Sequence, residues 1–204
     1  FYDLLDSLGR LDTYTKLSMN DYKALQDADV VITAFGDIKA LADGGNRFLE
    51  YSFNCQQAKQ VGTALKEAGF HGVLINISNP CDVITGLLQH YTGLSRQQVF
   101  GTGTFLDTAR MQRAVSMSLD QNPHNIAGYV LGEHGESQFA AWSTITVQGE
   151  PITEIAKDQH LELSELDKAA RGGGWLVFNG KKYTCYAIAT CAAKLLQAVF
   201  SDAK

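Results

Sequence analysis

The chain has 204 residues, a formal net charge of −5 and an apolar content of 45%. Such a composition is typical of a globular protein with a sizeable core, and an acidic balance without a Lys/Arg cluster argues against a nucleic-acid partner. No apolar run approaches the roughly 20 residues that a membrane-spanning helix needs. The acidic first residues also lack the basic start of a signal peptide. We therefore expect neither a nucleic-acid partner nor a membrane.

The four cysteines are not arranged as metal ligands or as a redox motif. Cys55, Cys81, Cys185 and Cys191 form no Cys-x-x-Cys pair and have no histidine at ligand spacing. This pattern argues against a zinc site, and we expect no metal. Reduced thiols are typical of the cytoplasm, which is the location that we expect.

Short apolar runs alternate with helical patterns in the first half of the chain. The expected elements are a strand at 29–35, a helix at 47–66, a strand at 72–77, a helix at 82–90 and a short strand at 99–100. The strand runs are rich in β-branched residues and are closed by Gly or by Asn-Pro. This order predicts right-handed βαβ units and a parallel sheet, which is an α/β fold.

Three residues directly follow the predicted strands. Ligands of parallel sheets bind outside the carboxyl ends of the strands, and Gly36, Asn79 and Gly101 fall at this edge. The amide of Asn79 can orient a cofactor or a substrate carbonyl, or it can simply cap the next helix. The glycine-containing stretch before Arg47 has the composition of a mobile loop. Arg47 is then either solvated or able to close over a bound substrate.

The second half of the chain is a mixture of helices and strands. We predict a helix at 106–119, strands at 127–131 and 142–147, and helices at 163–171 and 182–203, the last two separated by Gly172-Gly173-Gly174. The change of pattern near residue 101 predicts two domains, a parallel-sheet part at 1–101 and a mixed part at 102–204.

The segment Gly132-Glu133-His134-Gly135 places a histidine in a loop after an apolar run. Glycine on both sides allows close approach of a substrate, and imidazole can give and take a proton near neutrality because its unperturbed pKa is about 6.5. A solvent-exposed turn histidine is the plain alternative, since short motifs also occur by chance. The segment alone does not choose between the two.

Asp107 and Arg110 lie three residues apart in a predicted helix and share a face. One interpretation is a weak surface salt bridge. In the other interpretation the two residues have separate roles. Asp107 can accept a hydrogen bond from His134 and fix its tautomer, and Arg110 can hold a substrate carboxylate with two parallel hydrogen bonds. Together the three side chains suit proton transfer to a small carboxylic acid.

These residues stand in motifs that resemble the L-lactate/malate dehydrogenase superfamily along essentially the whole chain, with closest likeness to the L-2-hydroxyisocaproate dehydrogenases of lactic acid bacteria. The resemblance rests on residues 27–32, on Ile77-Ser78-Asn79-Pro80-Cys81-Asp82-Val83-Ile84-Thr85, on Gly101-Thr102-Gly103-Thr104-Phe105-Leu106-Asp107-Thr108-Ala109-Arg110, on Gly132-Glu133-His134-Gly135 and on Gly180-Lys181-Lys182-Tyr183-Thr184.

The resemblance implies NAD-dependent hydride transfer between a small 2-oxo acid and an L-2-hydroxy acid, in a homo-oligomer that is a dimer or a tetramer. It implies a Rossmann-like parallel sheet lacking its first strands at 1–101, the remainder of a dinucleotide-binding domain, and an incomplete mixed α+β substrate domain at 102–204. His134 matches the family's proton donor and acceptor, and Asp107 matches its partner. Arg110 matches the carboxylate clamp, and Arg47 matches the loop arginine that polarises the reacting carbonyl.

The resemblance also implies the residues that bind substrate and cofactor. Asn79 matches the asparagine beside the nicotinamide and the substrate oxygen. Thr184 matches a threonine of the substrate pocket, and Ile188 a side chain that packs on the nicotinamide. Gly36 follows the first predicted strand at the cofactor edge.

The chain departs from the family plan at both ends. The family's Gly-x-Gly-x-x-Gly motif and its ribose-binding acidic residue are absent, as are the last strands and the C-terminal helix. The first and last residues of the chain lie in helical patterns, so we expect a truncated, internal piece that binds NAD poorly. An inactive fragment that only folds or pairs with partner subunits is therefore an alternative.

The loop that contains Lys39 is the second departure from the family, and it bears on the size of the substrate. Lys39 stands near where lactate dehydrogenases of the family carry a glutamine and malate dehydrogenases an arginine, in a loop that is longer than usual. This favours a bulky, apolar 2-oxo acid. Malate dehydrogenase remains the alternative within the same chemistry.

Overall fold

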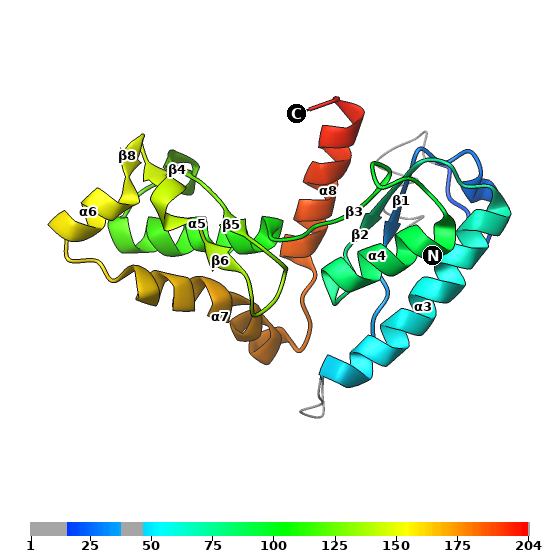
Figure 1. The fold of residues 1–204 in the computed structure, drawn as a ribbon, viewed down its shortest axis with the longest axis horizontal. Helices are drawn as coiled ribbons and strands as arrows, with labels where there is room; N and C mark the ends of the chain where they lie inside the picture. Colours follow the sequence, from blue (N-terminus) through cyan, green and yellow to red (C-terminus); the bar gives the residue numbers. More distant parts are fainter. Residues whose placement is uncertain (1–15, 38–46, 204) are drawn as a thin grey trace.

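The computed structural model describes residues 16–37 and 47–203, with the side chains of residues 47–49 left out of the description. Its elements form two groups at opposite ends of the longest axis, and the C-terminal helix α8 (Tyr186–Phe200) stands between them (Figure 1). The chain passes from one group to the other after residue 101.

The first group is built on a parallel sheet in the order β1-β2-β3. Its strands are β1 (Val30–Thr33), β2 (Val73–Asn76) and β3 (Val99–Gly101). Ile32 pairs with Ile75, and Ile75 pairs with Phe100. The prediction of a parallel α/β sheet is confirmed, and its three strands end at one common edge.

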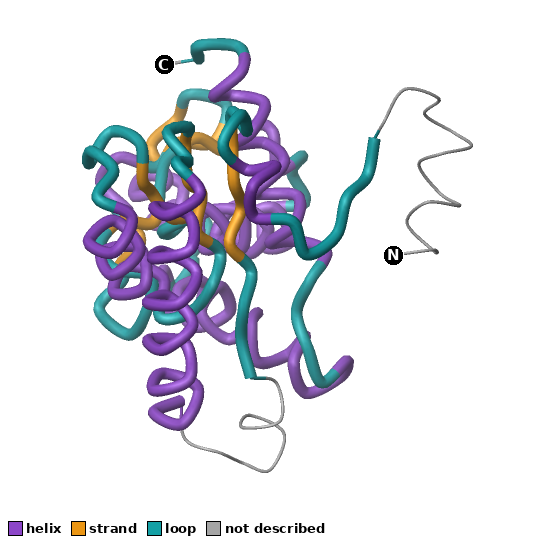
Figure 2. The backbone as a smooth tube through the Cα atoms, turned by 90° about the vertical axis from the view of Figure 1, so that its right-hand side faces the viewer, coloured by secondary structure: helices purple, strands orange, loops and turns teal. Residues whose placement is uncertain are grey.

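Two helices cover one face of this sheet. They are α3 (Arg47–Ala68) and α4 (Cys81–Thr92), which pack side by side, as Figure 1 and Figure 2 show. Their apolar faces and the strands share one core, formed by Ala58, Leu65, Phe70, Leu74, Ile84, Leu88, Leu94 and Val99. The one-turn helix η1 (Tyr22–Leu25) packs beside α3.

The second group is built on two long helices. α5 (Phe105–Leu119) packs along α7 (Leu163–Lys181), and the short α6 (Ile152–Asp158) contributes to the same core. Short antiparallel strands complete the group: β4 (Ile126–Ala127), β5 (Val130–Leu131), β6 (Phe139–Ala140), β7 (Thr146–Val147) and β8 (Glu150–Pro151), with the turns η2 (Pro123–Asn125) and η3 (Trp142–Thr144). A second core, around Met111, Val115, Ile145 and Ile152, holds these elements together.

The prediction for residues 127–147 was too simple. The strand expected at 127–131 is two strands of different sheets, β4 and β5, divided at Gly128. Gly128 has φ +117°, and a Cβ there would lie 2.6 Å from the side chain of Ile145. The strand expected at 142–147 begins instead as the turn η3, and the sequence pattern did not predict α6.

The division predicted at Gly172-Gly173-Gly174 was wrong, because α7 runs through all three glycines. Glycine weakens an isolated helix by about 1 kcal/mol relative to alanine, so tertiary contacts must support this part of α7. Helix α8 also begins later than residue 182. Lys182 ends α7 in the left-handed conformation, with φ +66°.

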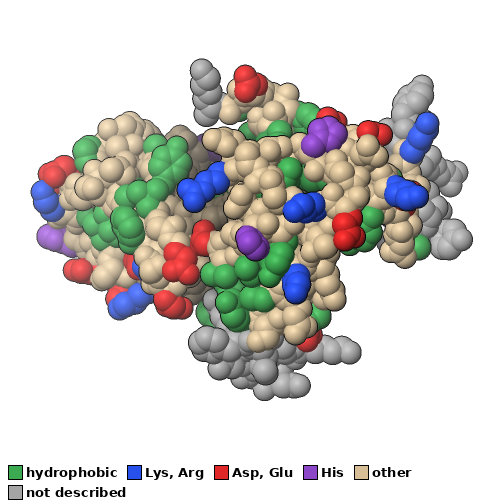
Figure 3. Space-filling view, turned by 45° about the vertical axis from the view of Figure 1, so that its right-hand side comes forward, with side chains coloured by type: hydrophobic (Ala, Val, Ile, Leu, Met, Phe, Trp, Pro, Cys, Tyr) green, Lys and Arg blue, Asp and Glu red, His purple; other side chains and the backbone are tan. Residues whose placement is uncertain are grey.

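None of the described helices is long and apolar enough to cross a membrane. Within the same residues no three His, Cys, Asp or Glu side chains gather into a possible metal site, and the cysteines are free. Basic and acidic side chains are interspersed on the face shown in Figure 3.

Candidate active site

The loop between β5 and β6 brings His134 to the start of α5. The Nδ1 atom of His134 lies 2.5 Å from Oδ2 of Asp107. Asp107 sits in the first turn of α5 and is only 3% exposed. Its burial would raise the pKa of this carboxyl, but hydrogen bonds and charge from His134 and Arg110 outweigh burial and hold the pKa below its ordinary value. Asp107 is therefore ionised at neutral pH, and Nδ1–H of His134 donates to it.

Asp107 also binds Arg110, one helical turn further along α5. The Nη1 atom of Arg110 donates to Oδ1 of Asp107 at 2.9 Å. One carboxylate thus holds the imidazole with one oxygen and the guanidinium with the other. The ion pair that the i,i+3 spacing predicts is present, and so is the contact with His134.

Arg110 borders a cavity of about 400 Å³ between α5, α7 and α8. The cavity brings together three residues that the sequence named, namely Arg110, Thr184 and Ile188. Thr184 is exposed and Ile188 is half-buried. The remaining lining is mostly apolar: Leu106, Ala109, Arg113, Gly173, Val177, Lys181, Cys185, Tyr186 and Ala187.

The turn after β2 lies beside the histidine loop. The backbone N–H of His134 donates to Oδ2 of Asp82 at 2.9 Å, and Asp82 follows Asn79 by three residues. The side-chain amide of the fully buried Asn54 donates to the carbonyl oxygen of Asn79 at 2.6 Å. Asn79 does not cap α4, because Pro80 occupies that position without a side-chain cap bond. The exposed Asn79 is therefore held by its backbone at the ligand edge.

Two predicted residues are only partly placed. Arg47 is the first residue of α3, but its side chain lies outside the described residues, as does the whole of Lys39. Gly36 follows β1 and is exposed at the same edge as Asn79. The relation of Arg47 to His134 stays a prediction.

Sequence reasoning missed two residues that support the site. Asp82 stands within the quoted Asn79-Pro80-Cys81-Asp82 motif, so a signal for it was present. Asn54 lies in the middle of a long helix, and nothing in the pattern distinguishes it from its neighbours.

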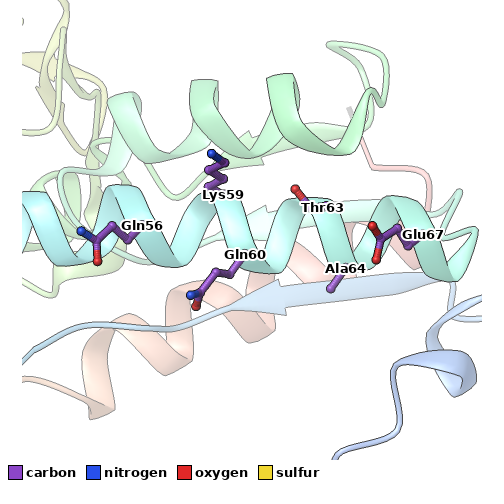
Figure 4. A pocket seen from close by; sticks show the side chains of 6 residues that line it. All are labelled: Gln56, Lys59, Gln60, Thr63, Ala64 and Glu67. Carbon is purple, nitrogen blue, oxygen red and sulfur yellow. The ribbon is translucent and has the colours of Figure 1, made fainter.

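A second hollow, of about 500 Å³, runs along α3. It is lined by Gln56, Lys59, Gln60, Thr63, Ala64 and Glu67, all from one helix, and Figure 4 shows their side chains leaving that helix in different directions. These groups do not converge on a point where a ligand could be held. The cavity at Arg110 has convergent charged, polar and apolar groups, and it is the better site.

Two family profiles match the chain from end to end. Residues 1–101 match the profile described as lactate/malate dehydrogenase, NAD binding domain, and residues 104–204 match lactate/malate dehydrogenase, alpha/beta C-terminal domain. The chain belongs to the lactate/malate dehydrogenase family. The parallel sheet expected from the sequence is confirmed, and the profile that matches residues 1–101 is that of an NAD-binding domain.

Known members of the family resemble the chain at moderate identity. It is 35% identical to the L-lactate dehydrogenase of Mycoplasma capricolum over 99% of its own length, and 34% identical to L-lactate dehydrogenase 3 of Bacillus anthracis over 98%. The chain spans 64% of the length of each of these curated relatives.

Solved structures of the family share the fold. The minor L-lactate dehydrogenase of Enterococcus mundtii, in its ligands-bound form, superposes with a TM-score of 0.86 at 34% identity, covering 97% of this chain and 63% of the other. The malate dehydrogenase of Aeropyrum pernix superposes with a TM-score of 0.84 at 22% identity, covering 100% of this chain and 64% of the other. The latter likeness concerns the fold alone.

The described residues fit the nicotinamide end of NAD. The exposed Asn79 offers an amide at the carboxyl end of β2, and Ile188 offers an apolar surface at the cavity. The family's glycine-rich phosphate motif is not among the 204 residues. Asn79 and Ile188 are the described residues that would hold the nicotinamide end of the cofactor when it is bound.

Proposed function

We propose that the protein is an NAD-dependent oxidoreductase that interconverts 2-oxo acids and L-2-hydroxy acids. The observation that carries the proposal is the double contact of Asp107, which binds His134 through one oxygen and Arg110 through the other. This arrangement joins a proton donor to a carboxylate-binding group, as reduction of a 2-oxo acid requires. Membership of the lactate/malate dehydrogenase family supports the same reaction.

Each residue has a separate role in this reaction. NAD, when bound, supplies the hydride in one direction and takes it in the other. Because Nδ1 of His134 binds Asp107, its Nε2 is left to give a proton to the carbonyl oxygen or to take one from the hydroxyl. Arg110 holds the substrate carboxylate. Following the family resemblance, Asn79 orients the reacting oxygen and Arg47 polarises the carbonyl.

The preferred substrate is a branched-chain 2-oxo acid of the 2-hydroxyisocaproate type. Leu106, Ala109 and Val177 give the cavity an apolar lining, and Gly173 has no side chain to fill it. The proposal includes a cytoplasmic location, which the free thiols support, and a homo-oligomeric assembly like that of the family.

Malate dehydrogenase activity is the second candidate. Arg113 and Lys181 also line the cavity, and a 2-oxo dicarboxylic acid needs a second cation for its second carboxylate. Of the two candidates, the apolar lining favours the enzyme for a monocarboxylic acid.

A substrate panel separates these candidates. With the full-length protein and NADH, we expect kcat/KM for 2-oxoisocaproate to exceed kcat/KM for pyruvate by roughly 10-fold or more, because each added apolar carbon in a pocket contributes about 1–3 kcal/mol. Initial rates of NADH consumption give the ranking. Oxaloacetate as the best substrate would replace the proposal with malate dehydrogenase, and a full-length protein that reduces none of the three acids would refute it.

Substitutions of the glycines in α7 provide a further test of whether Arg110 holds the substrate carboxylate. A Cβ at Gly174 would lie 3.3 Å from Nη2 of Arg110, whereas a Cβ at Gly172 would meet nothing within 4 Å. Both sites are helical, so alanine should stabilise the helix by up to about 1 kcal/mol at either of them. Gly174→Ala must also shift the Arg110 guanidinium by a few tenths of an ångström, so we expect KM for the 2-oxo acid to rise by roughly threefold, since misplacement by about 1 Å can cost 10²-fold.

Gly172→Ala is the matched control for this substitution. It should leave KM unchanged and leave Tm equal or higher. Equal KM values for the two alanine variants would show that Gly174 does not position Arg110.

A further inference from the structure

The loop that carries His134 is attached to α7 through hydrogen bonds of Arg171. Residues 132–138 contain no helix or strand between β5 and β6. Arg171 of α7 donates from Nη1 to the carbonyl oxygen of Glu136 at 3.1 Å and from Nη2 to the carbonyl oxygen of Gln138. Its Nε donates to Oδ2 of Asp167 at 2.6 Å. All three guanidinium nitrogens are engaged.

These bonds complete a set of anchors around His134. Asp82 of α4 accepts from its backbone N–H at 2.9 Å, and Asp107 of α5 binds its ring. The remaining side of the loop, after His134, is fixed by Arg171. Gly132 has φ +92°, a conformation that glycine adopts at no steric cost. Within the loop, Gln138 N–H donates to the carbonyl oxygen of Gly135 at 3.3 Å and Ser137 Oγ donates to Glu133 at 2.8 Å, and the anchors to α4, α5 and α7 fix the loop relative to the rest of the molecule.

Arg171 is itself held in place by Asp167. The two side chains are 32% and 28% exposed, whereas the partners of the Lys168–Glu165 pair on the same helix are 71% and 65% exposed. The planar guanidinium suits this position because it can reach two carbonyl oxygens and a carboxylate at once, which an ammonium group on a flexible stem does not reproduce. The better-shielded pair is the one that contacts the loop.

The same part of α7 contacts the carboxylate clamp. A Cβ at Gly173 would lie 3.3 Å from Cδ of Arg110, two residues after Arg171 in the helix. One stretch of α7 thus touches the His134 loop and Arg110, so it fixes the proton donor relative to the group that holds the substrate. Catalytic groups need placement to within about 0.5 Å, which loop residues achieve only through such supports.

We propose that Arg171 is a positioning residue that fixes the His134 loop relative to Arg110, with Asp167 as its orienting partner. The inference rests on the proposed function. It assigns Arg171 no contact with substrate or cofactor.

The test replaces Arg171 in the full-length protein. We expect Arg171→Gln to lower kcat for 2-oxo acid reduction roughly 10–100-fold, because a proton donor displaced by about 1 Å loses up to 10²-fold. KM should stay within about twofold, since the Arg110 contacts with Asp107 and the α7 backbone are untouched. Arg171→Lys should restore little of the rate, and Asp167→Asn should cause a smaller loss than Arg171→Gln.

Lys168→Gln is the matched control, since it removes the same charge from the same helix at an exposed ion pair. It should leave kcat and KM at the wild-type values. If kcat of Arg171→Gln fell only because the variant unfolds, its far-ultraviolet circular dichroism signal would fall as well. That result would overturn the proposal, and so would a wild-type kcat in this variant.

Amide hydrogen exchange tests whether Arg171 holds the loop in place, independently of the enzyme's activity. In Arg171→Gln the amides of residues 133–138 should exchange faster than in the wild type, while those of α5 and β2 stay unchanged. Unchanged exchange in the loop would contradict the anchor. If wild-type protein reduced no 2-oxo acid while loop exchange still responded, the proposed function would fail and the anchor would stand.

Discussion

Replacing His134 by Asn in the full-length protein is expected to lower kcat for 2-oxo acid reduction by about 10²–10⁴-fold, the usual contribution of a general acid–base group. Asparagine can still accept or donate a hydrogen bond, but it cannot supply a proton at neutral pH. KM should change much less, because Arg110 still holds the carboxylate. Steady-state rates of NADH consumption over a range of substrate concentrations measure both constants.

Two further variants accompany this substitution: one tests the contact between His134 and Asp107, and the other is the matched control. Asp107→Asn removes the charge that fixes the His134 tautomer, so its kcat should also fall, and the double variant should lose little more than His134→Asn alone. His160→Asn changes an exposed histidine whose left-handed φ of +54° asparagine tolerates well, and it should leave kcat unchanged. Retention of kcat in His134→Asn would remove His134 from the reaction.

The second large effect is expected at Arg110. Arg110→Lys should raise KM for a 2-oxo acid by roughly 10–100-fold, because hydrogen bonds between charged groups contribute about 1.5–3 kcal/mol and lysine cannot form the two parallel bonds. In the present geometry one nitrogen of Arg110 is already bound to Asp107 at 2.9 Å. A lysine ammonium would have to choose between Asp107 and the substrate.

Arg96→Lys is the matched control for this prediction. Arg96 is exposed in the turn before β3 and lies outside the cavity lining. Its replacement should leave KM unchanged. If Arg110→Lys bound the 2-oxo acid as tightly as the wild type, Arg110 would not be the carboxylate clamp.

The parallel sheet could be predicted because its strands are encoded locally in the sequence. The run from Val30 to Thr33 is β-branched, and the runs before Asn79 and Gly101 are apolar and end in residues that break strands. Helix α7 could not be predicted in the same way. Three adjacent glycines normally end a helix, but here they let α7 approach Arg110, a contact between residues more than 60 positions apart.

The three contacting residues could be named as candidates for a similar reason. Asp107 and Arg110 lie one helical turn apart, and His134 stands in a loop motif with glycines on both sides, so residue type and spacing suggested the contacts that the structure contains. Arg171 was beyond reach, because its bonds to the loop go to the backbone carbonyl oxygens of Glu136 and Gln138. Every residue has a backbone carbonyl oxygen, so a contact with that atom does not restrict the residue type of the partner.

We propose that His134, Asp107 and Arg110 together serve the NAD-dependent interconversion of a 2-oxo acid and an L-2-hydroxy acid. The most direct measurement follows NADH consumption and product together, in the full-length protein with 2-oxoisocaproate, and identifies the product by chiral chromatography. We predict one L-2-hydroxy acid formed for each NADH consumed. NADH that is not consumed, or consumption without formation of the L-2-hydroxy acid, would contradict the claim.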